Sequence, residues 1–216
     1  MQASLVQIFA KYPRAGSVKT RMIPAVGPEA AAELQLALLQ DICWRLHGSF
    51  QVEIWGTDSA AKEHYCSLIN KYNLGFRRQC EGDLGVRLEC AVASAFRRGS
   101  WPILVGADCP HIDVDLIDAI DTELDCGADA VMVPAIDGGY VALGLSVKNN
   151  QLFSGIDWGT GRVAEQTLDA MYKTGIECVV LEPMQDIDYF EDLHGLMGSS
   201  NNIRSQALND WMERHL

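Results

Sequence analysis

The sequence predicts an α/β protein with three layers, α/β/α, in which helices cover both faces of a mostly parallel, mixed sheet. Short apolar runs alternate with segments whose apolar residues recur at helical spacing. One run, residues 101–106, is compact and almost entirely apolar, as is typical of a central strand buried on both faces. No repeat, linker or low-complexity segment interrupts the 216 residues, so we expect a single domain over 1–216.

The first half of the chain is predicted to alternate strands and helices. Gly27-Pro28 is expected to open the first helix, because proline suits the first helical position. Apolar residues then follow at helical spacing and predict one buried stripe: Ala31, Leu34, Leu38, Ile42 and Leu46. The predicted strands are 4–10, 51–56, 75–79 and 101–106, and the later helices are 60–70 and 84–98.

The second half continues this alternation. One helix is marked by apolar residues on a single face: Ile112, Leu116, Ile120 and Leu124. Gly127 is expected to stop that helix, and Thr160 is expected to cap another that runs to about Tyr172. The remaining predicted elements are strands 130–135, 140–145 and 177–181 and helices 190–197 and 203–215.

The composition excludes several classes of protein. Hydrophobic residues make up 48% and charged residues 21%, which is globular composition. The formal charge of −12 repels polyanions, so we expect no nucleic acid and no anionic membrane as partner. No apolar run approaches the ~20 residues of a membrane-spanning helix. The start of the chain also lacks the basic region of a signal peptide.

The seven cysteines form no C-x-x-C pair and match no zinc-binding spacing. We therefore interpret them as reduced, mostly buried thiols of a cytoplasmic protein. Cys109 lies beside an acidic motif, but nothing near it in the sequence marks an activated thiolate. We expect Cys109 to fill a turn.

A cationic loop follows the first predicted strand. Ligands of parallel α/β sheets bind beyond the carboxyl ends of the strands, where the strand order reverses. Residues 11–21 hold four of the chain's 17 cations: Lys11, Arg14, Lys19 and Arg21. Gly16 permits close backbone approach and Thr20 adds a hydroxyl, so the loop suits a di- or triphosphate. The alternative is a solvated basic loop that pairs with surface acids.

Acidic residues follow two other predicted strands. Asp108 comes directly after strand 101–106, where a carboxylate is a natural ligand for Mg²⁺ or Mn²⁺. The alternative for Asp108 is helix capping, for which Asp113 is better placed. Asp186 and Asp188 follow the last strand, and carboxylates at i and i+2 of an extended segment point the same way. Both could face one metal, or Asp188 could cap the next helix.

Three further segments could bind ligands. Residues 136–139 contain Asp137 and two glycines between two strands, where a ligand could lie against the backbone; a tight hairpin turn is the alternative. Residues 79–87 join a strand to a helix whose N-terminus could meet a base or a phosphate. Trp158 could line an acceptor pocket, although simple packing would also explain it.

Taken in order, these segments resemble the DUF2064 family, a bacterial group of GT-A-like glycosyltransferases. The resemblance covers roughly residues 5–195 and is carried by FAKYPRAGSVKTRM, QCEGDLGVRL, GADCP, PAIDGGYVALGL, FSGIDWGT and DIDYFEDL. The group is similar to the wider nucleotide-diphospho-sugar transferase superfamily, which includes molybdenum-cofactor guanylyltransferases and phospholactate guanylyltransferases. The resemblance therefore implies a GT-A fold.

The resemblance also implies roles for the candidate residues. Asp108 and Asp188 would bind the metal, and Asp108 would act in catalysis together with Lys19 and Arg21. The residues implied to hold the nucleotide and its phosphates are Lys11, Arg14, Gly16, Lys19, Thr20, Arg21, Gln79, Gly82, Asp83 and Arg87. The residues implied to border the acceptor or sugar are Asp137, Gly138, Gly139, Tyr140 and Trp158.

The implied reaction is transfer from a nucleotide-activated donor, preferably a nucleotide-sugar, with Mg²⁺ or Mn²⁺. The metal and the basic residues would neutralise phosphate charge as the leaving group departs, so no dedicated nucleophile is required. A second possibility is nucleotidyl transfer from an NTP to a phosphorylated or hydroxylated small acceptor, with release of pyrophosphate. A third is a non-catalytic nucleotide-binding protein, because GADCP holds one acid where a full D-x-D element holds two.

Overall fold

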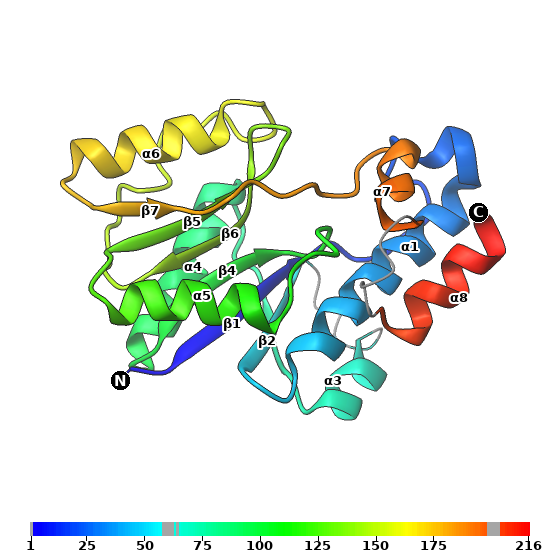
Figure 1. The fold of residues 1–216 in the computed structure, drawn as a ribbon, viewed down its shortest axis with the longest axis horizontal. Coiled ribbons are helices and arrows are strands. Elements are labelled where there is room, and N and C mark those ends of the chain that lie inside the picture. Colours follow the sequence, from blue (N-terminus) through cyan, green and yellow to red (C-terminus); the bar gives the residue numbers. More distant parts are fainter. Residues whose placement is uncertain (1, 58–62, 64, 198–203) are drawn as a thin grey trace.

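One mixed sheet of seven strands organises the part of the chain that the structure describes (Figure 1). The computed structural model describes residues 2–57, 63, 65–197 and 204–216. Across the sheet the strands stand in the order β3-β2-β1-β4-β6-β5-β7. Their bounds are Ser4–Ala10 (β1), Gln51–Gly56 (β2), Gly75–Arg78 (β3), Trp101–Gly106 (β4), Ala130–Pro134 (β5), Tyr140–Leu145 (β6) and Cys178–Val180 (β7).

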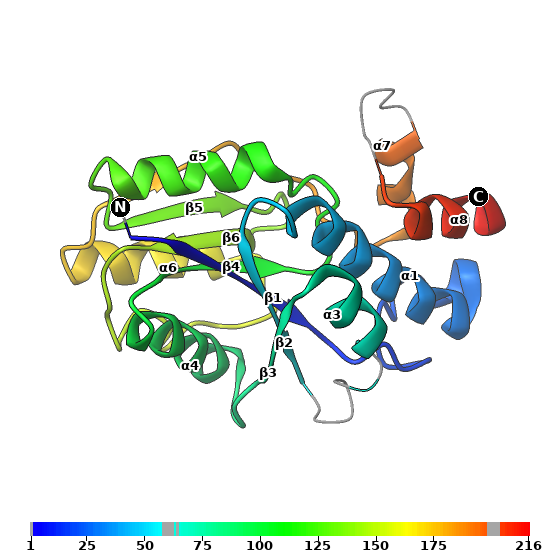
Figure 2. The same cartoon turned by 90° about the horizontal axis from the view of Figure 1, so that it is seen from below.

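Helices cover both faces of the sheet, as Figure 2 shows from below. Side chains of α1, α3 and α5 pack against one face, and those of α4 and α6 pack against the other. The predicted three-layer α/β/α architecture is therefore confirmed. The helices are Ile23–Leu46 (α1), Cys66–Tyr72 (α3), Leu84–Arg97 (α4), Val114–Asp125 (α5), Val163–Lys173 (α6), the 3₁₀ turn Phe190–Leu193 (η1), His194–Met197 (α7) and Gln206–His215 (α8).

The strand order reverses between β1 and β4. The chain adds β2 and then β3 on one side of β1, and it adds β4 on the other side, all in parallel. Residues 135–139 turn β5 directly into β6, so β6 runs antiparallel to both β4 and β5. The carboxyl ends of β1, β4 and β5 thus meet the start of β6 at one edge of the sheet.

The apolar patterns of the sequence predict the core well. The predicted stripe of α1 is buried at every position, with no member more than 1% exposed: Ala31, Leu34, Leu38, Ile42 and Leu46. The N-terminal half of this stripe packs against α8 and against residues 187–196, beyond the sheet (Figure 1). Among the described residues, no helix combines the length and the apolar character that crossing a membrane requires.

Three expected helix boundaries differ from the structure. α1 begins at Ile23, before Gly27, whose φ of +81° interrupts the helix; Pro28 then starts its long regular part. The N-cap of α6 is Arg162, because the Thr160 hydroxyl donates to the carbonyl of Asp157 instead of capping the helix. The predicted helix 60–70 corresponds to α3, and its residues 60–62 and 64 lie outside the described residues.

The interpretation of all seven cysteines as reduced, mostly buried thiols is wrong in two respects: one pair is oxidised, and among the five free cysteines only Cys43 and Cys109 are buried. Cys80 and Cys90 form a disulfide with Cα atoms 6.5 Å apart, which ties the end of β3 to α4. The two cysteines are ten positions apart in the sequence, and that spacing carries no signal; only the folded chain brings them together. Cys109 is fully buried, and burial raises the pKa of its thiol to about 12, as suits a residue that fills a turn.

The single domain over 1–216 stays a prediction, and α8 provides its test. Trp211 is fully buried against α1, and its indole N–H donates to the carbonyl of Ala30 over 2.9 Å. We expect Trp211→Ala to lower the free energy of unfolding by about 3–5 kcal/mol, measured by urea denaturation as one shifted transition. Tyr172→Ala, at an aromatic residue 86% exposed, is the control and should leave stability unchanged. Two separate transitions in the wild-type protein would contradict the single domain.

Candidate active site at the carboxyl ends of the central strands

A cavity of about 560 Å³ opens where the strand order reverses. Its walls come from segments far apart in the sequence: the ends of β1 and β4, the β5–β6 turn, the first turn of α4 and the segment after β7. The predicted site residues that line it are Lys11, Lys19, Thr20, Arg21, Gln79, Arg87, Asp108, Asp137, Gly139, Tyr140, Trp158 and Asp188. The fold therefore gathers the basic loop and the acidic motifs in one place.

Three carboxylates converge in this cavity. One oxygen from each of Asp108, Asp186 and Asp188 lies within 4.8 Å of the others. The backbone N–H of Ile187 donates to the carbonyl of Asp108 over 2.9 Å, so the segment after β7 is held against the end of β4. Asp186 is a third carboxylate beside Asp108 and Asp188, the two metal ligands named from the sequence. The i, i+2 spacing of Asp186 and Asp188 is the signal that points to it.

Lys19 lies among these carboxylates. Its Nζ is 3.5 Å from Oδ2 of Asp108 and 3.3 Å from Oδ1 of Asp188, and it also donates to the carbonyl of Ile187. Its side chain is only 3% exposed, and a charged amine so deeply buried requires such partners. The backbone of Lys19 has a φ of +45°, which is uncommon for a residue with a side chain. The packing of the loop therefore fixes the ammonium group at this point.

Arg21 forms the outer part of the same network. Its Nη1 lies 2.5 Å from Oδ2 of Asp188, and its guanidinium stands 5.3 Å from the centre of the Tyr189 ring. The Arg21 side chain is 53% exposed, so a ligand entering the cavity can reach it. The loop thus contributes one buried and one accessible cation to the network around the carboxylates.

Asp108 and Asp188 are not helix caps, which was the alternative that the sequence left open for both. Asp113 caps α5, because its carboxylate accepts from the N–H of Leu116 over 3.0 Å. After β7, the carboxylate of Asp192 accepts from the N–H groups of Asp188 and Tyr189. Asp108 and Asp188 are therefore left to contact Lys19, and Asp188 also contacts Arg21.

Crowding of the carboxylates changes the acidity of Asp186. Partial burial raises the pKa of its carboxyl to about 6, and the nearby negative charges of Asp108, Asp137 and Asp188 act in the same direction. Negative charges therefore lie close together around Asp186. A cation entering from solution would relieve that repulsion.

Several predicted residues of the 79–87 segment shape the wall and do not face the cavity. The carboxylate of Asp83 accepts from the N–H of Val86 over 2.9 Å and so caps α4. Gly82 has a φ of +125°, and its carbonyl accepts from Nε of Arg87. Gln79 does line the cavity, although its amide donates to the carbonyl of Trp55. The predicted contacts of Gly82 and Asp83 with a nucleotide stay predictions.

The β5–β6 turn has a structural reason for its two glycines. A Cβ atom on Gly138 would lie 2.1 Å from the carbonyl oxygen of Gly161, and the φ of Gly138 is +93°. Gly138 therefore lets the turn pack against residues 157–163 and does not itself line the cavity. The carboxylate of Asp137 accepts from the N–H of Gly139 over 2.9 Å, which closes the turn and holds Asp137 at the cavity wall.

Two residues of the basic loop lie outside the cavity wall. Arg14 places its guanidinium 5.5 Å from the centre of the Tyr12 ring, and Gly16 adopts a φ of +80° in the turn.

On the opposite wall, Trp158 packs against Gly85 at the start of α4, where a Cβ would lie 3.0 Å from the indole Nε1. Trp158 therefore both packs against the start of α4 and lines the cavity.

Comparisons with known proteins agree with this architecture. A family model described as "Uncharacterized protein conserved in bacteria (DUF2064)" matches residues 42–160. A crystal structure from Desulfovibrio desulfuricans G20, named "putative nucleotide-diphospho-sugar transferase", is 29% identical with a TM-score of 0.88. That match covers 99% of this chain and 95% of the other. No curated protein matches the chain.

More distant solved structures share the fold. A cytidylyltransferase from Leptospira borgpetersenii serovar Hardjo-bovis is 14% identical with a TM-score of 0.59, covering 99% of this chain and 93% of that one. The 4-diphosphocytidyl-2C-methyl-D-erythritol synthase of Anaerococcus prevotii DSM 20548 is 9% identical with a TM-score of 0.55, covering 89% and 96%. At such identities the likeness concerns the fold alone. The expected nucleotide-diphospho-sugar transferase fold is confirmed.

The crowded carboxylates predict that Asp186→Asn stabilises the metal-free protein. The folded pKa of about 6 exceeds the usual 3.8, so the folded state binds more protons between these values and loses stability as pH rises through them. At pH 7.5 with EDTA we expect the variant to gain about 1 kcal/mol, discounted for partial exposure, or ~2–4 °C in Tm. The gain should disappear near pH 4, where the wild-type carboxyl is protonated.

Thermal unfolding at both pH values measures this effect. Asp118→Asn, on the exposed face of α5, is the matched control and should change Tm little at either pH. An Asp186→Asn variant that melts at or below the wild-type temperature at pH 7.5 would contradict the effect of burial and repulsion described above.

Proposed function

We propose that this chain, which belongs to the DUF2064 family, is a divalent-metal-dependent transferase that uses a nucleotide-activated donor. A nucleotide-sugar is the donor that we favour. One observation carries the proposal: three carboxylates and two cations converge in one cavity where the strand order reverses. In open α/β sheets that position is where ligands bind.

The three carboxylates suit a hard cation. Mg²⁺ and Mn²⁺ prefer carboxylate oxygens, and two oxygens that share one ion lie no further apart than about twice the ~2.1 Å metal–oxygen distance, or slightly more for relaxed geometry. The spacing of up to 4.8 Å between oxygens of Asp108, Asp186 and Asp188 requires only small side-chain adjustments. When bound, Mg²⁺ or Mn²⁺ would supply Lewis-acid stabilisation of the departing phosphate.

The basic residues of the cavity would bind the phosphates of the donor. Arg21 is exposed at the cavity wall and can form paired hydrogen bonds with phosphate oxygens. Lys19 is held close to the carboxylates, so its positive charge lies where the leaving group gains negative charge. Lys11 and Arg87 line the cavity and add positive charge on either side. These residues act by position and charge, which phosphoryl and glycosyl leaving groups both need.

The opposite wall would receive the acceptor. Asp137 stands on the rigid β5–β6 turn and lines the cavity together with Tyr140 and Trp158. A carboxylate can accept a hydrogen bond from an acceptor hydroxyl and so orient it toward the donor. The aromatic side chains offer apolar surface that would exclude water from the reacting groups. We infer that the acceptor carries a hydroxyl group.

Nucleotidyl transfer is the second candidate reaction. The observation that favours this reaction is the basic loop directly after β1, which suits a triphosphate as well as a diphosphate. The substrates would then be an NTP and a phosphorylated or hydroxylated small acceptor, and pyrophosphate would be released. A non-catalytic nucleotide-binding protein remains the third hypothesis, and the product assay below separates all three.

The released product distinguishes the candidate reactions. Purified protein is incubated with Mg²⁺ or Mn²⁺, a panel of nucleotide-sugars or NTPs, and pooled hydroxylated and phosphorylated acceptors. Release of NDP from a nucleotide-sugar supports the favoured reaction, and release of pyrophosphate from an NTP supports nucleotidyl transfer. Thermal stabilisation by a nucleotide without any turnover would instead identify a binding protein.

Asp108→Asn tests the role of the metal-binding carboxylates. The substitution keeps the shape of the side chain and removes its charge, so we expect turnover to fall by roughly 10²–10³-fold with an unchanged fold. Steady-state kinetics across a Mn²⁺ titration, with circular dichroism as the folding check, measure the effect. Asp118→Asn again serves as the control and should retain full turnover. Wild-type turnover in Asp108→Asn would remove Asp108 from the proposed site.

A further inference from the structure

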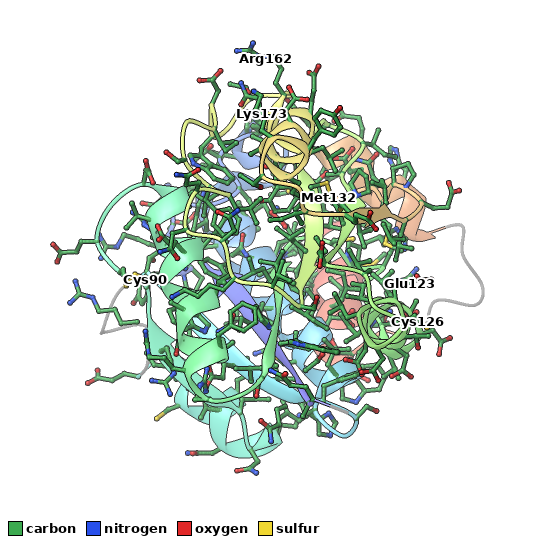
Figure 3. The ribbon with its side chains drawn as sticks, turned by 90° about the vertical axis from the view of Figure 1, so that its left-hand side faces the viewer. Cys90, Glu123, Cys126, Met132, Arg162 and Lys173 are labelled. Atoms are coloured by element: carbon green, nitrogen blue, oxygen red, sulfur yellow. A yellow bond between two sulfur atoms is a disulfide. The ribbon has the colours of Figure 1, made fainter. Side chains whose placement is uncertain are left out.

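A second groove, also of about 560 Å³, lies between β3 and α4. Figure 2 shows α4 beside β3, and Figure 3 labels Cys90 of α4 on the side of the molecule away from Glu123 and Cys126. Among the described residues, this groove and the candidate active site share no lining residue. The disulfide Cys80–Cys90 lies in the groove wall and joins its two sides.

The groove is cationic in an acidic protein. Arg77, Arg78 and Arg97 line it with a single carboxylate, that of Glu89, although the chain as a whole carries a charge of −12. Arg97 is exposed and has no hydrogen-bond or ion-pair partner within the described residues. Arg78 pairs with Glu81, whose side chain is 91% exposed, and an ion pair so open to solvent is weak. Guanidinium groups are therefore available to an anion here.

Glu53 contacts two arginines at one end of the groove, Arg77 and Arg98. Its buried carboxylate is bound by the two terminal nitrogens of Arg98, so it is already neutralised. Nε of Arg77 lies 3.4 Å from the same carboxylate, which brings Arg77 to the end of α4 that also carries Arg97. An anionic group bound at this end would meet two guanidinium groups, and paired guanidinium contacts favour phosphate.

The rest of the groove is mainly apolar. Trp55 pairs with Arg77 in the β2–β3 register, so both side chains stand on the α4 side of the sheet. The Trp55 side chain is 3% exposed and lines the groove, yet its indole Nε1 has no hydrogen-bond partner within the described residues. Val86 and Ala93 on α4 add apolar surface. The protein itself covers this Nε1 atom, so Trp55 contributes apolar surface to the groove and its indole signal can report on a ligand bound there.

We propose that this groove binds a small organic phosphate, with the phosphate at Arg77 and Arg97 and the apolar body against Trp55. This site is separate from the proposed active site and does not depend on the transferase function. It uses the cationic end for charge and the small side chain of Ala93 for space.

An NMR titration of the ¹⁵N-labelled protein with phenyl phosphate tests the site. Trp55→Phe assigns the indole signal of Trp55, and the protein is kept without reductant so that the disulfide stays intact. We expect a saturable shift of the Trp55 signal, about tenfold weaker binding in Arg97→Ala, and no saturable shift with phenol. Arg77→Ala should weaken binding similarly, and it serves as the second variant if Arg97→Ala fails to fold.

Two controls separate this groove from other cationic sites. Arg21→Ala removes a cation of the candidate active site, and Lys173→Ala removes one from α6 (Figure 3); neither should weaken the Trp55 response. The proposal is overturned if the Trp55 signal does not move saturably, if phenol reproduces the shift, or if the shift persists unweakened in Arg97→Ala. Loss of the shift in Arg21→Ala would also overturn it, because the ligand would then occupy the other cavity.

Discussion

The buried ammonium group of Lys19 is the interaction on which the candidate site depends. Three carboxylates stand within 4.8 Å of one another at the sheet edge, and their mutual repulsion opposes the folded state. Lys19 contacts Asp108 and Asp188 and is itself only 3% exposed, so the lysine and the carboxylates each require the other. Burial, and after it the negative charges of the neighbouring carboxylates, still raise the pKa of Asp186. In the proposed function, a bound Mg²⁺ or Mn²⁺ compensates the negative charge of the three carboxylates.

The topology of the sheet brings these groups together. Lys19 follows β1, Asp108 follows β4, and Asp186 and Asp188 follow β7, so three parallel strands deliver their next residues to one edge. The antiparallel β6 lies between β4 and β5 and places the β5–β6 turn on the same side. The hydrogen bond from Ile187 to the carbonyl of Asp108 then closes the gap across that edge. The site is thus a consequence of strand order rather than of any one motif.

The sequence predicts this site because its signals are local. A carboxylate directly after an apolar strand, two acids at i and i+2, and a cationic loop after the first strand each mark the same edge of an α/β sheet. The choice of Asp113 over Asp108 as a helix cap could also be made from position alone, and the structure confirms it for Asp113.

Features that depend on contacts between distant segments were not predictable. Gly138 is required by the carbonyl of Gly161, and the Cys80–Cys90 disulfide is required by the packing of β3 beside α4. Neither partner stands at a spacing that a sequence pattern reveals. Thr160 is not a cap for a different, local reason, because its hydroxyl donates to the carbonyl of Asp157 three residues before it. Local patterns thus locate the edge of the sheet that carries the candidate site, and tertiary contacts decide which neighbouring residues only shape its walls.

Anomalous diffraction from crystals soaked in Mn²⁺ would test the central claim most directly. We expect one strong peak within about 2.5 Å of carboxylate oxygens from Asp108, Asp186 and Asp188, because hard divalent ions bind such oxygens at short distance. An empty cavity at saturating Mn²⁺, or a peak bound by other carboxylates, would contradict the account.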